Sequence, residues 1–123
     1  MPDFLSHEWL EDFDGALRAD STVATRFAAN PIAIAQEVGT VRYVVVLDES
    51  GGRLERGDTS ADVTFACDRE TAAALARGEL NAQRALTSGR LKLRGDIDRL
   101  GAAADALTAL GDVLAELRTA TSF

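Results

Sequence analysis

The sequence predicts the α+β class, with a five-stranded, mainly antiparallel sheet and helices covering one of its faces. Helical apolar patterns stand near both ends of the 123-residue chain. Between them, apolar and polar residues alternate in consecutive segments from Ile32 to Cys67, and they alternate again around Leu91 and Leu93. Because helices and strands are not regularly interleaved, a doubly wound parallel sheet is not expected.

The first 31 residues predict a helix and a shorter helical turn. Apolar residues at every fourth position predict a helix over residues 6–19 with one apolar stripe. The stripe consists of Leu5, Trp9, Phe13 and Leu17. A helical turn is expected from Val23 to Ala29. Pro31 ends it, because the residue before a proline disfavours the helical conformation.

The middle of the chain predicts four strands, over residues 32–38, 41–48, 53–56 and 62–67. Gly51 and Gly52 suit a tight turn between the second and third strands. In each strand, one set of alternate residues is more apolar than the other. This pattern is typical of an antiparallel sheet with one covered face and one wetter face.

The last part of the chain predicts two short helices, a strand and a long helix. Asp68 is a good N-cap for a helix that Gly78 terminates, and Asn81 and Gly89 bracket the second. The final strand covers residues 90–94. Asp96 then caps a helix of about six turns with three-and-four apolar spacing. Its stripe contains Ile97, Leu100, Ala103, Leu107, Leu110, Leu114 and Leu117.

Composition and charge narrow the classes of function. A hydrophobic fraction of 46% fits one domain over residues 1–123, and the net charge of −7 argues against nucleic-acid binding. No apolar run approaches the roughly 20 residues that span a bilayer. The acidic N-terminal segment lacks the features of a secretory signal, so a cytoplasmic location is expected.

Few residues suit catalysis or metal binding. Cys67 is the only cysteine and His7 the only histidine, so neither an intramolecular disulfide nor a zinc site of cysteines and histidines can form. We expect Cys67 to be a buried, inert thiol and His7 to be a solvated residue at a helix start. No catalytic residue, metal or cofactor is therefore predicted.

The segment from Asn81 to Gly95, NAQRALTSGRLKLRG, resembles the sterol carrier protein 2 family. Matching positions are Gln83, Arg84, Ala85, Gly89, Arg90, Leu91, Lys92, Leu93, Arg94 and Gly95. Upstream, residues 61–80 resemble the family's strand and acid-capped helix ending in Gly-x-Leu. Ala82 stands where the family has a proline, and Leu86 and Thr87 stand where it has two aromatic residues. The resemblance therefore does not assign a sterol as the ligand.

The resemblance implies helices and a sheet that enclose an internal apolar cavity for a lipid, a fatty acyl chain or a sterol-like molecule. The candidate lining residues are Val45, Leu47, Phe65, Leu75, Leu86, Leu91, Leu93, Leu100, Leu107, Leu110 and Leu114. Periodicity alone fits an ordinary filled core equally well. The alanine-rich helix faces leave room either for a ligand or for close helix packing.

The basic residues Arg84, Arg90, Lys92 and Arg94 lie in a segment with a net charge of +3 over residues 77–99. They are either a solvated face or a contact site for an anionic head group or membrane. The leading hypothesis is a carrier of a hydrophobic ligand. The alternatives are an enzyme or accessory domain that holds an apolar biosynthetic intermediate, and an interaction module that dimerises.

Overall fold

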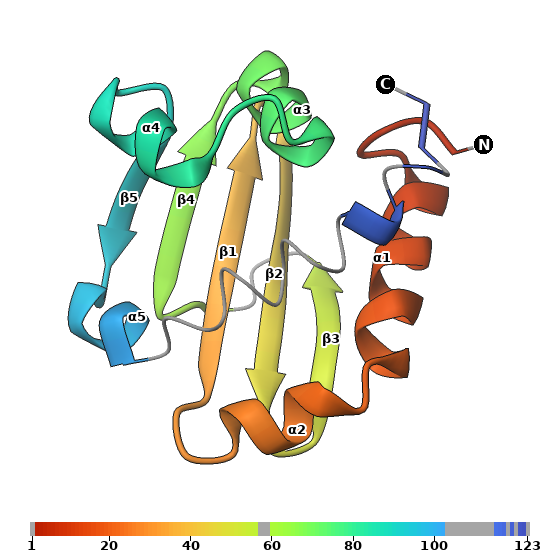
Figure 1. Cartoon of the computed structure of the whole chain (residues 1–123), viewed down its shortest axis with the longest axis vertical. Helices are drawn as coiled ribbons and strands as arrows, with labels where there is room; N and C mark the ends of the chain where they lie inside the picture. Colours follow the sequence, from red (N-terminus) through yellow and green to blue (C-terminus); the bar gives the residue numbers. More distant parts are fainter. Residues whose placement is uncertain (1, 57–59, 103–114, 118, 120, 123) are drawn as a thin grey trace.

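The computed structural model describes residues 2–56, 60–102, 115–117, 119, 121 and 122. Its helices are α1 (His7–Ala19), α2 (Thr22–Phe27), α3 (Arg69–Arg77), α4 (Ala82–Thr87) and α5 (Ile97–Ala102). Its strands are β1 (Ile32–Val38), β2 (Val41–Asp48), β3 (Gly51–Arg56), β4 (Val63–Cys67) and β5 (Lys92–Gly95). The strands form one sheet in the order β3-β2-β1-β4-β5 (Figure 1), so the predicted fold class is confirmed.

The sheet is mixed, because β1 pairs with β2 in antiparallel and with β4 in parallel orientation. The β2–β3 and β4–β5 ladders are antiparallel. The register aligns Ile34 with Val45 on one side and with Val63 on the other. Since side chains alternate between the two faces of a strand, these three residues lie on the same face, which we call the inner face.

The inner face carries the hydrophobic core, and α1 and α2 cover one part of it. Trp9, Phe13 and Leu17 of α1 and Val23 and Phe27 of α2 are almost fully buried. The Trp9 ring meets the rings of Phe13 and Tyr43 edge to face, with centroids 5.3 and 6.5 Å apart. This aromatic cluster fixes α1 against the sheet.

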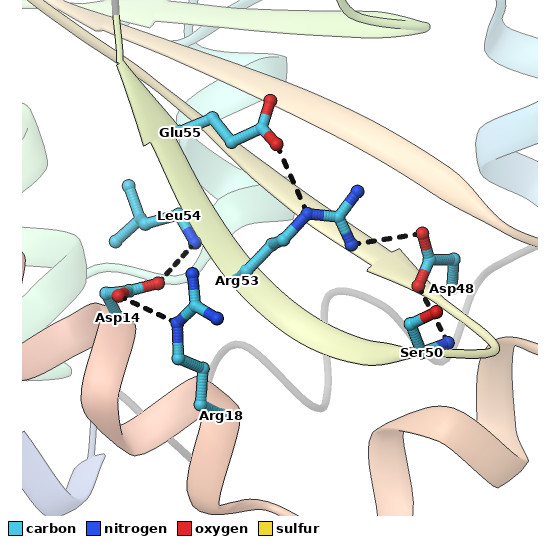
Figure 2. A network of polar contacts seen from close by, with 7 residues as sticks. All are labelled: Asp14, Arg18, Asp48, Ser50, Arg53, Leu54 and Glu55. Carbon is cyan, nitrogen blue, oxygen red and sulfur yellow. Dashed lines mark hydrogen bonds and ion pairs between the residues drawn. The ribbon is translucent and has the colours of Figure 1, made fainter.

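The outer face carries charged pairs around a buried centre. Arg53 contacts Asp48 at 3.1 Å and Glu55 at 3.2 Å (Figure 2). Ala35 and Val44, which are cross-strand neighbours in the middle of this face, are fully buried. The outer face is therefore less wet than the alternating sequence pattern predicts.

A carboxylate of α1 closes part of the sheet edge at β3. Asp14 accepts a hydrogen bond from the Leu54 backbone N–H at 2.8 Å and a second from Arg18 Nε at 2.9 Å (Figure 2). Helix α1 lies along β3 in Figure 1. The contact pairs a backbone donor that an edge strand would otherwise leave to solvent or to another chain.

Residues near the two ends of the chain lie together. Ser122 forms backbone hydrogen bonds with Phe4 and Pro2, each at 2.8 Å. The buried Trp9 indole N–H donates to Thr121 Oγ1 at 3.0 Å. Sequence patterns gave no indication of this pairing, because it joins segments more than 110 residues apart.

The predicted long C-terminal helix is only partly described. Helix α5 covers Ile97–Ala102, and residues 115–117 are also helical. The intervening part of the predicted stripe, including Leu107, Leu110 and Leu114, lies outside the described residues. Ile97 was expected to begin a buried stripe, but 58% of it is exposed.

Candidate functional site

The inner face is closed at its α1 end and only half-closed at its α3 and α4 end. At the second end, six apolar side chains of β4, β5, α3, α4 and the α3–α4 connection pack against the core yet remain partly accessible. This half-buried cluster consists of Cys67, Ala72, Leu75, Leu80, Leu86 and Leu93. Figure 1 shows α3 and α4 at the end of the sheet where β4 ends and β5 begins. The cluster is therefore a partly open apolar surface beside a closed core.

Helix α3 is held at this end by strong local signals. Asp68 accepts a hydrogen bond from the Thr71 backbone N–H at 2.7 Å, and Gly78 ends the helix with φ 77°. Hydrogen bonding to Thr71, followed by the nearby Arg90, holds the pKa of Asp68 below its usual value. The buried contacts of α3 are made by Ala73, Ala74 and Ala76 together with Thr71. Small side chains thus give close packing here, while Leu75 stays half-buried.

Helix α4 and strand β5 form the neighbouring wall. The Asn81 side chain accepts from the Arg84 backbone N–H at 2.7 Å and begins α4. A backbone bond from Leu91 to Ala85 at 3.1 Å holds the connection to β5 against the helix. Ala85 and Leu91 are buried, whereas Leu86 and Leu93 are half-buried. The predicted caps at Asp68 and Asn81 are confirmed by these contacts.

The structure divides the predicted lining residues into two groups. Val45, Leu47, Phe65 and Leu91 are buried in the core. Leu75, Leu86 and Leu93 belong to the half-buried cluster. The structure does not describe the side chain of Leu100, and Leu107, Leu110 and Leu114 lie outside the described residues. A role for any of these residues in lining a cavity stays a prediction.

The predicted basic contact residues are all exposed, but their surroundings differ. Arg84 belongs to α4, and Arg90 precedes β5 close to Asp68. Lys92 and Arg94 lie on β5. Arg94 Nη2 donates to both carboxylate oxygens of Glu37 at 2.7 Å, so that guanidinium already has an anionic partner. Arg94 therefore differs from Arg84, Arg90 and Lys92, because its charge is already paired with a carboxylate.

Cys67 and His7 lie in surroundings that favour neither nucleophilic nor general-base chemistry. Burial, followed by the neighbouring Asp68, raises the pKa of the half-buried Cys67 thiol, which keeps it protonated. The exposed His7 contacts Glu11 at 2.8 Å through Nε2 and Arg56 at 2.8 Å through Nδ1. Within the described ranges, no group of three or more His, Cys, Asp or Glu residues is arranged to hold a metal ion.

Two polar residues of the inner face were missed as site candidates. Gln36 of β1 is half-buried, and Tyr43 of β2 lies directly opposite it. Gln36 interrupts the inward series of Ile32, Ile34 and Val38, and this break in an apolar series is the signal that could have identified it. Burial, followed by the neighbouring Cys67, raises the pKa of Tyr43, so its hydroxyl stays neutral.

A surface pocket of about 520 Å³ lies apart from the half-buried cluster. Its walls come from the α2–β1 connection and the start of α5. The lining residues are Ala29, Asn30, Pro31, Asp96, Asp98 and Arg99. Since its walls are largely polar and charged, it does not suit a hydrophobic ligand.

Comparison with known families decides which of these features belong to a shared architecture. The model of the SCP-2 sterol transfer family matches residues 10–108. The chain belongs to this family. The match includes the capped helix α3, the α4–β5 segment and the strands that carry the inner face. The suspected resemblance to the sterol carrier protein 2 family is confirmed.

Solved SCP-2 structures share the fold at low sequence identity. A crystal structure of sterol carrier protein 2 is 22% identical with a TM-score of 0.74, covering 93% of this chain and 98% of that one. The protein TT1886 from Thermus thermophilus is 21% identical with a TM-score of 0.69, and the match covers 100% of this chain and 93% of TT1886. Among curated proteins, none matches this chain in sequence.

The SCP-2 fold also occurs inside an enzyme. The sec-alkylsulfatase Pisa1 from Pseudomonas sp. is 20% identical with a TM-score of 0.52, covering 65% of this chain but only 13% of that enzyme. The SCP-2 domain is in general a lipid-binding, non-catalytic fold. In the described part of this chain, no helix has the length and apolar character needed to cross a membrane.

Proposed function

We propose that this chain acts as a single carrier domain that binds a hydrophobic ligand against the inner face of its sheet. Membership of the SCP-2 family supports lipid or sterol binding or transfer in general. The observation that carries the proposal is the half-buried cluster, which leaves several apolar side chains partly accessible beside a closed core. The ligand is a lipid, a fatty acyl chain or a sterol-like molecule.

The driving force for such binding is removal of apolar surface from water. Burial contributes about 25 cal/mol per Å² of apolar surface, before the ordering costs of binding are subtracted. Leu75, Leu86 and Leu93 each still expose part of their side chains. A ligand that covers them gains this contribution on both partners, and no covalent bond needs to form or break.

Two leucines at opposite edges of the sheet provide a matched test of the binding surface. Leu93 on β5 and Leu54 on β3 are both half-buried residues of edge strands and both pack against the core. Only Leu93 belongs to the half-buried cluster. We expect Leu93→Gln to weaken binding of the neutral dye Nile red by about five- to tenfold, since it removes apolar contact equivalent to about 1 kcal/mol.

The control variant Leu54→Gln should bind the dye as wild type does, because Leu54 lies beside α1, away from α3 and α4. Fluorescence titration measures both affinities, and thermal melting checks that the two variants fold. Equal affinity for wild type and Leu93→Gln would show that the cluster is not the binding surface.

Native mass spectrometry of the protein purified from its own host separates the carrier from the alternatives. A retained hydrophobic molecule is expected for a carrier or for a domain that holds an apolar biosynthetic intermediate. A clean dimer with no added mass is expected for an interaction module. The chemical identity of the retained mass then distinguishes an abundant lipid from a pathway intermediate.

We further propose that Arg84, Arg90 and Lys92 contact an anionic head group or membrane surface near the cluster. Each exposed basic residue contributes about 1 kcal/mol near such a surface, within a Debye length of roughly 8 Å at physiological salt. Arg94 contributes less, because Glu37 already neutralises it. The net charge of −7 opposes the contact and makes it weak and sensitive to salt.

Charge reversal tests this contact. Lys92→Glu should slow transfer of a labelled lipid from anionic vesicles several-fold at low salt and have little effect at high salt. Arg26→Glu, at an exposed cation of α2 remote from the cluster, is the matched control. A transfer rate that responds equally to the two reversals would show that only net charge matters.

A further inference from the structure

The inner face contains two polar side chains for which the described part of the chain offers no side-chain hydrogen bond. Gln36 and Tyr43 are cross-strand partners in the β1–β2 ladder. The Gln36 amide and the Tyr43 hydroxyl form no side-chain hydrogen bond with any residue that the structure describes. Tyr43 is 6% exposed and lies in the core cluster. Among the described residues, neither group is a fully buried polar atom without a partner, so both remain accessible to a bound molecule.

The position of the pair relates it to the proposed binding surface. In the register, Gln36 lies between Tyr43 on β2 and Phe65 on β4. The next inward position along β4 is Cys67, which belongs to the half-buried cluster. The polar pair therefore borders the cluster, on the side toward the Trp9 and Phe13 rings that pack against Tyr43.

We propose that Gln36 and Tyr43 bind the one polar oxygen of an otherwise apolar ligand, and that this oxygen belongs to an uncharged alcohol or carbonyl group. The inference rests on the proposed carrier function and names the ligand class for the same site. The glutamine amide offers both a donor and an acceptor, and the tyrosine hydroxyl does the same. Together they can bond a hydroxyl group in both directions or donate twice to a carbonyl oxygen.

Two features favour an uncharged group over a carboxylate. Arg56, the β3 residue opposite Tyr43, donates to His7 Nδ1 at 2.8 Å and to the His7 carbonyl oxygen at 3.3 Å. Arg69, at the start of α3, donates to the Phe4 carbonyl oxygen at 3.0 Å and stacks on the Phe4 ring. A buried carboxylate without a cation would be strongly unfavourable.

The test uses three competitors with one scaffold and different polar groups. Hexylbenzene has none, 4-hexylbenzyl alcohol has an uncharged hydroxyl, and 4-hexylbenzoate is an anion. Each displaces Nile red from the wild-type protein, from Tyr43→Phe and from Gln36→Met. We expect wild type to prefer the alcohol over both other compounds. Each variant should lose about fivefold in affinity for the alcohol and nothing in affinity for hexylbenzene.

Melting temperatures and a control variant distinguish a ligand-binding role of Tyr43 from a purely structural one. Tyr43→Phe keeps the ring that packs on Trp9, so ligand-free Tyr43→Phe should melt at or above the wild-type temperature. Thr64→Val removes a hydroxyl from the outer face of β4 and should leave the competitor order unchanged. A lower melting temperature of Tyr43→Phe with an unchanged alcohol preference would overturn the proposal.

Other outcomes are equally distinct. If all three competitors bind and both variants keep the wild-type affinities, the carrier function stands and the polar contact is wrong. Preference of wild type for 4-hexylbenzoate would overturn the uncharged class. Failure of every competitor and of Nile red itself to bind would overturn the proposed function and this inference with it.

Discussion

At the scale of single residues, Gly95 shows how one backbone position fixes the end of the candidate site. Gly95 has φ 112°, a region that L side chains rarely adopt. A Cβ atom there would overlap the Asp62 carbonyl oxygen and lie 3.0 Å from Val63 Cα. The same Asp62 carbonyl accepts the Asp96 backbone N–H at 2.8 Å. The glycine that closes β5 is therefore required by close backbone approach to β4.

Replacing this glycine should destabilise the protein. We expect Gly95→Ala to lower the free energy of unfolding by about 1–3 kcal/mol, since the alanine is strained and its Cβ displaces backbone. Chemical denaturation measures the loss. Gly15→Ala is the control, because a Cβ at Gly15 in α1 would meet nothing within 4 Å and alanine favours helix. Equal stability of Gly95→Ala and wild type would contradict the close approach.

Residue-level prediction from sequence succeeded where the signal is local. Asp68, Gly78 and Asn81 were identified as helix boundaries because capping depends on a few consecutive residues. That Gln36 and Tyr43 form no side-chain hydrogen bond with the residues that the structure describes could not be predicted. Whether a polar side chain has a partner depends on strands that meet only in the folded chain.

At the scale of elements, periodicity located the strands and most helices. The five strands and the helices α1, α3 and α4 lie close to the predicted ranges, because each has its own apolar period and turn residues. The turn before β3 was placed wrongly, because Gly51 and Gly52 pair with Asp48 and Leu47 inside the β2–β3 ladder. Which strands pair with each other was harder to predict from the sequence. The parallel β1–β4 ladder joins segments that are separated by two other strands, and no local pattern encodes that choice.

The contact between α1 and β3 gives a prediction at this scale. Asp14→Ala should lower the free energy of unfolding by about 1–2 kcal/mol, because it leaves the Leu54 N–H without its charged acceptor. It should also promote association through the uncovered edge of the sheet. Denaturation and light scattering measure the two effects. Asp12→Ala is the control, because Asp12 lies on the same helix without that contact and the change brings the same gain in helix propensity. It should neither destabilise the protein nor promote association.

At the scale of the whole molecule, one half of the structure has a fully buried core and the other half has a partly exposed one. Aromatic side chains of α1 fill the first half. The second half contains α3, α4 and β5, where the half-buried cluster and the exposed basic residues lie. Whether the leucines lined a filled core or an open surface could not be predicted, since both give the same periodicity. The burial difference between Leu91 and Leu93 is visible only in the structure.

The lengths of the strand ladders have a consequence for how the molecule opens. The β1–β2 ladder has seven paired positions and β2–β3 has six, whereas β1–β4 has five and β4–β5 has four. The first two join strands consecutive in the chain, so closing them orders little intervening backbone. We expect the β1–β3 meander to form early in folding and to open last.

Amide hydrogen exchange should show this order directly. Amides of β1 and β2 should exchange only through global unfolding, and those of β5 should exchange through a smaller opening of lower free energy. Uniform protection across the sheet would contradict the gradient. The strand that borders the proposed ligand surface would then be the first to separate, and a molecule could enter or leave while the rest of the sheet stays folded.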